Sequence, residues 1–218
     1  MALSCVIVAL ILLLSADVLF LSLHLVYLQT SLSLIDDRGF WLEQERGYAE
    51  VFQYIKEYWT AMLMAWLALR CRQLHYIAWA LLFLYFLADD SIQVHERIGF
   101  AIARRLELRH AFGLRAADFG ELLVSGTIGA LWLPLGLVTF IRAPSEVKGI
   151  GIRMVIIVSG LAAFGVVSDM LHQLTDKGGI ASAVAGTIED WGEMLVMSVG
   201  LSYVFSEALT RWSRCLRL

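Results

Sequence analysis

Long apolar stretches recur along the whole chain, and they constrain its fold more than any other feature. The first runs from Ser4 to Leu28 and is interrupted only by Asp17 and His24. About 20 apolar residues in a helix are enough to cross the hydrocarbon core of a bilayer. The 218 residues are 59% hydrophobic and only 17% charged, with a mean hydropathy of +0.72, which excludes a disordered chain and an ordinary soluble domain. The sequence therefore predicts an integral membrane protein.

The spacing of these stretches predicts an all-α, polytopic membrane helix bundle in a single domain over residues 1–218. Charged residues interleaved with apolar ones predict one or two interfacial amphipathic helices, at 36–50 and 98–117. We expect the first stretch to be retained as a span, because the first Lys or Arg is Arg38 and a cleaved signal peptide begins with a basic region. About six transmembrane helices fit the pattern, at 4–28, 51–69, 74–97, 120–141, 150–174 and 180–209.

The third of these spans has to carry polar residues into the membrane if it is to cross. Its apolar part ends at Ala88, and 15 residues of helix measure about 21 Å. A bilayer core is roughly 30 Å thick. We therefore expect a continuous helix that brings Asp89 and Glu96 to one face, with Asp90 and His95 on other faces.

Acidic side chains gather in one half of the predicted spans, the half that lies far from the chain termini. They come late in the third and fifth spans and early in the sixth, and successive spans run in opposite directions. The groups therefore lie at a common depth, and we predict that they share a site. The side chains that carry this prediction are Asp89, Glu96, Asp169, His172, Glu189 and Glu193.

Such a cluster needs compensation, because one charge at the centre of a span costs about 2.5 to 3.5 kcal/mol. The nearest basic residues, Lys56 and Arg97, are predicted to lie at the interface rather than among the acids. Bound cations, protons shared between carboxyl groups, or a water-filled funnel would each provide that compensation.

A bound divalent metal ion is the most economical of these explanations. The D-x-x-H and E-x-x-x-E spacings place three carboxylates and an imidazole where they can converge on one or two ions. A carboxylate-rich set with few histidines suits Fe, Mn, Zn or Ca. We predict Asp89 and Glu96 as catalytic groups that complete the shell or act as general base. The predicted metal ligands are Asp169, His172, Glu189 and Glu193.

Three functions are compatible with this pattern. The first is a membrane metalloenzyme, a hydrolase or an oxidase, that acts on a lipid or another apolar substrate entering from the bilayer. The second is a cation or proton transporter that uses the same acids, and the third is an accessory or assembly subunit. The absence of an inverted repeat favours the enzyme over the transporter. Nucleic acid is not an expected partner, because the net charge is −3 and no basic surface stands out.

Orientation follows from the predicted topology. An even number of crossings places both termini on one side, together with the basic residues of the 70–72 loop and the C-terminal tail. Cys5, Cys71 and Cys215 fall on the same side without the spacing of a disulfide framework, so we predict free thiols in a reducing compartment. The termini are therefore expected to be cytoplasmic.

Overall fold

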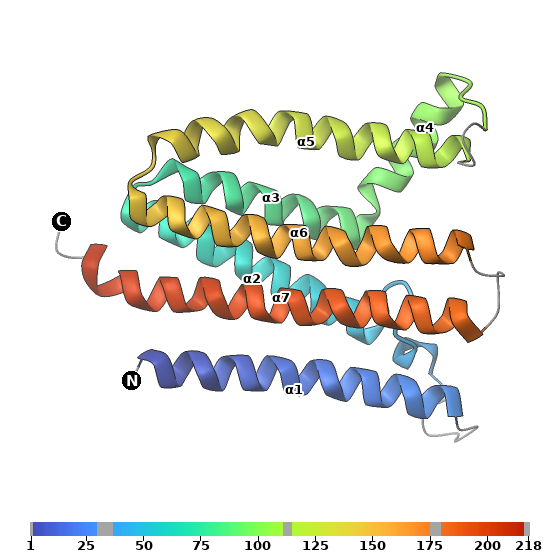
Figure 1. The fold of residues 1–218 in the computed structure, drawn as a ribbon, viewed down its shortest axis with the longest axis horizontal. Helices are drawn as coiled ribbons and strands as arrows, with labels where there is room; N and C mark the ends of the chain where they lie inside the picture. The colour runs from blue at the N-terminus through green and yellow to red at the C-terminus, as the bar shows by residue number, and fades with distance from the viewer. Residues whose placement is uncertain (1, 30–36, 111–114, 175–179, 216–218) are drawn as a thin grey trace.

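The computed structural model describes residues 2–29, 37–110, 115–174 and 180–215 (Figure 1). For residues 2, 165–174, 180–183 and 212–215 it describes the backbone alone. The elements are α1 (Ala2–Gln29), the 3-10 helix η1 (Arg38–Phe40), α2 (Tyr48–Cys71), α3 (Leu74–Ile92), α4 (Val94–Arg105), α5 (Ala116–Arg142), α6 (Ser145–Leu174) and α7 (Ile180–Cys215).

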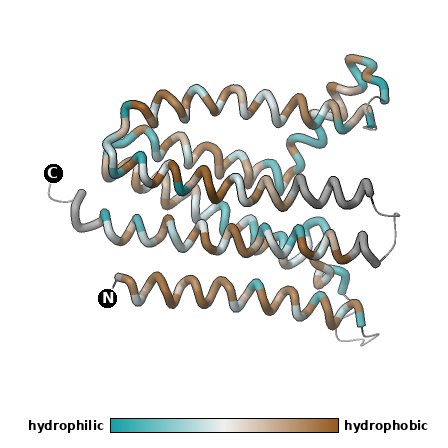
Figure 2. Tube along the Cα trace, viewed as in Figure 1, coloured by the Kyte–Doolittle hydropathy of each residue, from teal (hydrophilic) through white to brown (hydrophobic). Residues whose placement is uncertain are grey.

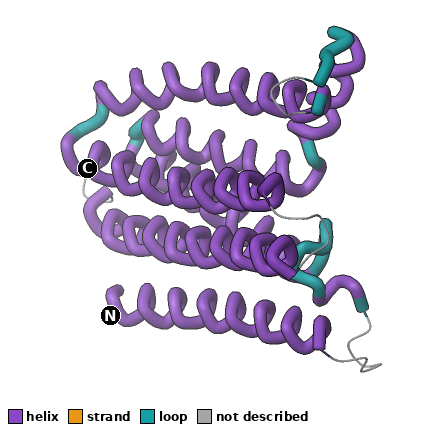
Figure 3. The backbone as a smooth tube through the Cα atoms, turned by 45° about the vertical axis from the view of Figure 1, so that its right-hand side comes forward, coloured by secondary structure: helices purple, strands orange, loops and turns teal. Residues whose placement is uncertain are grey.

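The long helices α1, α2, α3, α5, α6 and α7 run alongside one another (Figures 1 and 3), and the described loops 72–73 and 143–144 join α2 to α3 and α5 to α6. Both chain termini lie at one end, which we call the termini end. The opposite end carries η1 and α4 and is called the distal end (Figure 1). The prediction of an all-helical fold is confirmed.

Three helices are long and apolar enough to cross a membrane, and a fourth if α3 and α4, bent by 72°, form one broken span. These segments are Leu3–Gln29, Ala116–Arg142 and Ser145–Phe164, with Leu74–Arg105 as the bent pair. They make the chain a membrane protein. The count of about six is not confirmed, because α2 and α7 are not among the helices that are long and apolar enough to cross. Figure 2 shows hydrophobic residues along most of α1 and α5, and hydrophilic ones concentrated at the distal end.

The core of the bundle lies where α2 and α3 pack against α6 and α7. Large apolar side chains fill it in mutual contact, and such van der Waals packing is one of the interactions that hold membrane helices together. Its fully buried members include Met64, Leu67, Tyr76, Trp79, Phe83, Met154, Met197 and Val204.

A buried ion pair joins α1 to α2 and α7. The Lys56 ammonium group donates to Asp17 Oδ1 at 3.1 Å, to the Met194 carbonyl oxygen at 2.8 Å and to Ser198 Oγ at 3.3 Å. Ser198 in turn donates to Asp17 Oδ2 at 2.5 Å, and the Lys56 and Asp17 side chains are fully buried. The expectation that Lys56 lies at the interface is wrong. The residues next to it in sequence are charged and aromatic, as in an interfacial helix, but the Lys56 side chain points toward α7.

His24 makes a second buried polar contact between α1 and its neighbours. Its Nδ1 accepts the backbone N–H of Leu42 at 3.0 Å, and its Nε2 lies 3.1 Å from Thr187 Oγ1 on α7. Because Nδ1 is the acceptor, the hydrogen of the neutral ring is on Nε2. His24 thereby fixes the loop that follows η1 against α1 and α7.

The third predicted span is broken rather than continuous. Gln93 adopts a left-handed conformation, with φ 55° and ψ 52°, and α4 leaves α3 there at 72°. Beyond the break α4 folds onto the start of α5, where Gly99 and Gly120 bring the two backbones together. A Cβ atom at Gly120 would clash with the Gly99 carbonyl oxygen. The predicted interfacial helices at 36–50 and 98–117 also differ from the structure. Within 37–47 the one helical element is η1, and α4 ends at Arg105, so the described residues 106–110 and 115 are not helical.

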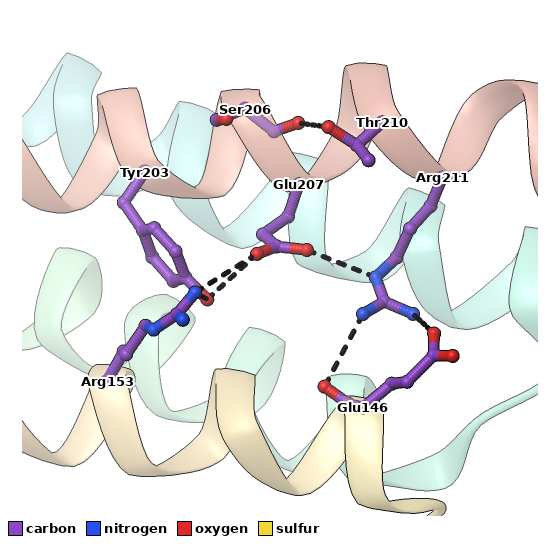
Figure 4. A network of polar contacts seen from close by, with 7 residues as sticks. All are labelled: Glu146, Arg153, Tyr203, Ser206, Glu207, Thr210 and Arg211. Carbon is purple, nitrogen blue, oxygen red and sulfur yellow. Dashed lines mark hydrogen bonds and ion pairs between the residues drawn. The ribbon is translucent and has the colours of Figure 1, made fainter.

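An ionic network closes the termini end between α6 and α7 (Figure 4). Glu207 accepts from Arg211 Nε at 3.1 Å and from the Tyr203 hydroxyl at 3.1 Å, and lies 3.6 Å from Arg153 Nη1. Arg211 also reaches Glu146 Oε2 at 3.5 Å. These contacts cross-link the two helices near the C-terminal end of α7.

The cysteines differ from the sequence prediction at one position. Cys5 is a free, exposed thiol, as predicted. Cys71, at the C-terminal end of α2, is disulfide-bonded, so the prediction of a free thiol is wrong there. Disulfides persist in oxidising compartments. A disulfide at Cys71 therefore gives no support to a reducing compartment at the termini end, and cytoplasmic termini stay a prediction.

We expect Lys56→Met and Asp17→Leu, each alone, to destabilise the protein by about 3 to 5 kcal/mol, because each leaves one buried charge without its partner. The double variant should recover most of this loss, since two apolar side chains replace the pair. Thermal unfolding in detergent measures all three. Losses that simply add in the double variant would show that the two side chains do not interact.

Gly120→Val should destabilise the protein by roughly 1 to 3 kcal/mol, because the new side chain forces α4 away from α5. Gly126→Val is the matched control on the same helix, since a Cβ atom there meets nothing within 4 Å. Equal melting temperatures for the two variants would contradict the close packing of α4 on α5.

Candidate functional site

A cavity of about 420 Å³ opens at the distal end of the bundle. We call it the acidic pocket. Its wall is formed by the loop after η1, the first turns of α2, the end of α3, the start of α4 and the first half of α7. The residues that line it are Leu42, Glu43, Gln44, Glu45, Ala49, Glu50, Gln53, Asp89, Asp90, Gln93, His95, Glu96, Gly186, Glu189, Asp190, Glu193 and Met194.

Carboxyl groups dominate the wall of the acidic pocket. His95 is the one basic side chain in the lining, and among the described residues no Lys or Arg contributes to it. Carboxylates collected in a cleft repel one another and attract cations from solution. The nine acidic residues in the lining are Glu43, Glu45, Glu50, Asp89, Asp90, Glu96, Glu189, Asp190 and Glu193.

The polar face of α2 supplies one side of the pocket. Glu50, Gln53 and Glu57 follow one another at i, i+3 and i+7, so they lie on one face of the helix. Tyr54, from the neighbouring position, donates its hydroxyl to the Asp90 carbonyl oxygen at 3.0 Å. This hydrogen bond holds the end of α3 against α2 and places Asp90 opposite the acidic face.

The break between α3 and α4 supplies a second side. Asp89 accepts the His95 backbone N–H at 2.8 Å, and its other oxygen lies 2.8 Å from His95 Nδ1. The carboxylate therefore satisfies one of the unpaired N–H groups in the first turn of α4, where negative charge is favoured. A straight helix would keep the two side chains apart, so the bend at Gln93 creates this pair.

The segment 37–47, which contains η1 and the loop after it, closes the rim. Asp37 accepts from the Tyr48 hydroxyl at 2.6 Å and from the Gly39 N–H at 2.9 Å. These hydrogen bonds, of which the one from Tyr48 has the largest effect, hold the pKa of Asp37 below its ordinary value. Farther along the loop, Glu45 accepts from Gln93 Nε2 at 3.0 Å, which ties the loop to the break.

Three buried acceptor atoms in or directly behind the pocket lining have no hydrogen-bond partner among the described residues: Gln53 Oε1, Glu57 Oε2 and Asp190 Oδ2. Gln53 is 8% exposed and Glu57 is 3% exposed. Glu57 lies behind the lining and shares a hydrogen bond with Asp90, which requires one proton between the two carboxyl groups. Buried acceptors without donors are rare in proteins, and they point to a ligand or an ordered water that supplies N–H or O–H groups.

The ammonium group nearest the pocket, that of Lys56, already makes its full set of hydrogen bonds. Lys56 Nζ contacts Met194 from behind, through its carbonyl oxygen, and Met194 lines the pocket. Its three hydrogens are directed to Met194, Asp17 and Ser198, which satisfies the group completely. Lys56 therefore stabilises the wall without neutralising the cavity.

Four of the six predicted site residues meet in the acidic pocket. Asp89, Glu96, Glu189 and Glu193 all line it. The side chains of Asp169 and His172 lie outside the described residues. Within the described part of the chain, no three His, Cys, Asp or Glu side chains form a group that could hold a metal ion. The predicted metal ligands and catalytic roles stay predictions.

Several residues in or directly behind the pocket lining were missing from the predicted set. Glu43, Glu45 and Glu50 belong to a segment that resembled an interfacial helix, and Gln53 and Glu57 fell in the second span without being singled out. The i, i+3, i+7 spacing of Glu50, Gln53 and Glu57 was the available signal. Asp90 was expected on another face of its helix than Asp89, but both line the pocket.

The chain belongs to a family that is described as a domain of unknown function, DUF8692, and that matches residues 4–207. That range includes every residue of the acidic pocket. No curated protein and no solved structure matches the chain.

We expect Asp89→Ala to loosen the first turn of α4 by about 1 kcal/mol, the usual effect of losing an N-terminal capping oxygen. Amide hydrogen exchange in α4 should become roughly fivefold faster. Asp89→Asn retains the acceptor for the His95 N–H and should preserve most of the protection. Exchange that is unchanged in Asp89→Ala would show that the cap does not hold α4.

Proposed function

We propose that this protein is a multi-pass membrane transporter for cations and that the acidic pocket is its cation-binding site. One observation carries the proposal: nine acidic residues from separate elements line a single cavity, and no Lys or Arg among the described residues lines it with them. Cations entering that cavity would relieve the mutual repulsion of the carboxylates. The pocket opens at the distal end, so cations are captured from the solution on that side.

Buried polar side chains continue along α7 below the pocket, which favours transport over binding alone. Ser198 and Ser202 are buried on α7, and Ser202 Oγ has no hydrogen-bond partner among the described residues. Ser198 contacts the buried Lys56–Asp17 pair. Nearer the termini end, Tyr203 and Glu207 belong to the network in Figure 4. Buried polar groups inside membrane helices commonly mark ion pathways.

In this proposal α2 and α7 also cross the membrane, which gives six crossings with both termini on one side. Most of the described charged side chains of these two helices are buried or half-buried within the bundle, as the full burial of Lys56 illustrates, whereas Arg70 is exposed at the termini end. Charges in that position are tolerated because the neighbouring helices supply their partners.

The metal-dependent membrane hydrolase or oxidase is the second candidate. The imidazole of His95 favours it, because this nitrogen ligand lies beside Asp89 in a lining that also contains Glu189 and Glu193. A divalent ion bound there would activate water or oxygen, with lipid as substrate. Elemental analysis of the purified protein separates the candidates, since the enzyme requires a stoichiometric metal and the transporter does not.

The transporter predicts cation uptake by proteoliposomes. Purified protein should support flux of at least one of Na⁺, K⁺, Mg²⁺, Mn²⁺, Zn²⁺ and short aliphatic amines down an imposed gradient. Glu193→Gln should reduce that flux at least tenfold, because a carboxylate deep in the lining is lost. Glu107→Gln is the matched control, an exposed acid at the distal end that does not line the pocket. Absence of flux for every cation, with folded protein, would overturn the proposal.

A further inference from the structure

We infer that the ligand of the acidic pocket is a linear aliphatic polyamine, a hydrocarbon chain that carries two or more ammonium groups. This inference rests on the proposed function and specifies the class of cation. Four observations support it: the dispersion of the carboxylates, the unpartnered buried acceptors, the apolar part of the lining, and the way the protein already holds an alkylammonium group.

The carboxylates are spread around the cavity instead of converging on one point. A bare metal ion needs several ligand atoms within about 2.0 to 2.6 Å of itself. Among the described residues no three potential ligands are placed that way. Their carboxyl groups come from the loop after η1, α2, α3, α4 and α7, around about 420 Å³. Cavities of a few hundred Å³ suit organic molecules, and a ligand with separated charges matches separated carboxylates.

The unpartnered acceptors require hydrogen-bond donors. Gln53 is more than nine-tenths buried and lines the pocket, and among the described residues its Oε1 has no partner. Asp190, which also lines the pocket, has an Oδ2 without a partner in the same part of the chain. A primary ammonium group offers three N–H donors and a secondary one offers two. A polyamine therefore satisfies these acceptors at several points, while its positive charges neutralise the carboxylates.

The lining also contains apolar surface where the methylene groups of such a ligand would lie. Leu42, Ala49 and Met194 are buried members of one cluster, and each lines the pocket. Aliphatic stems of charged groups are stabilised along apolar surface in this way. A hydrated inorganic ion would gain nothing from contact with this apolar surface.

The protein itself holds an alkylammonium group directly behind the pocket. The Lys56 side chain is a primary ammonium on a four-carbon stem, and it is bound by a carboxylate, a carbonyl and a hydroxyl oxygen. Its Nζ also lies 5.0 Å from the centre of the Phe52 ring, a cation–π distance. The distal half of the bundle is thus an environment that retains an alkylammonium ion away from water.

Isothermal titration calorimetry of the full chain in detergent tests the inference. The probes are n-butylamine, putrescine, spermidine and spermine, with Mg²⁺, Ca²⁺, Mn²⁺ and Zn²⁺ for comparison. We expect affinity to rise with the number of ammonium groups, and spermidine to bind more tightly than any of the metal ions. Gln53→Leu should weaken spermidine binding roughly tenfold, because a charge-assisted hydrogen bond is lost. Glu107→Gln should leave it unchanged.

The outcomes separate the two proposals. Saturable metal binding with no binding of polyamines would overturn this inference and leave the cation transporter standing. No binding of any cation would overturn both. Amines that bind weakly and equally, whatever their number of charges, would indicate attraction to surface acids and would also overturn the inference. Because the wild-type protein decides these outcomes, they do not depend on whether Gln53→Leu folds.

Discussion

An ammonium group enclosed by three helices holds the distal half of this bundle together. Lys56 reaches from α2 to Asp17 on α1 and to Met194 and Ser198 on α7, and all of its hydrogens are used. Without this contact α1 would rest on its neighbours mainly through apolar side chains, which lipid can replace. A buried pair of opposite charges cannot be exchanged for lipid, so it determines which helices meet.

The acidic pocket depends on that arrangement. Met194 connects the Lys56 contact to the acidic pocket, because its carbonyl oxygen accepts from Lys56 and the residue also lines the cavity. On the opposite wall, the break at Gln93 turns α4 across the end of the bundle and pairs Asp89 with His95. Lys56, the nearest ammonium group, is thus used in structural contacts, and the lining of the cavity stays acidic. This separation is why a cation supplied from outside fits the site.

The local sequence pattern was sufficient for some parts of this result and not for others. The apolar stretches predicted the helices, because a lipid-compatible helix needs a continuous run of apolar residues. The common depth of Asp89, Glu189 and Glu193 was also predictable, from the alternating direction of the spans. The break at Gln93 was not, since neither Gly nor Pro marks it. Lys56 was misplaced because its surroundings in sequence resemble an interfacial helix, while its partners Asp17 and Ser198 are distant in sequence.

The sequence by itself determined that the chain is a helical membrane protein and that Asp89, Glu189 and Glu193 lie at one depth. These properties depend on hydropathy and on helical periodicity, which are local. Only the tertiary structure decided which acids share a cavity, where Lys56 finds its partners, and how Gly99 and Gly120 bring α4 onto α5. The physical reason is that the direction of a side chain depends on how helices rotate and bend against one another, and that is settled by contacts between segments far apart in the chain.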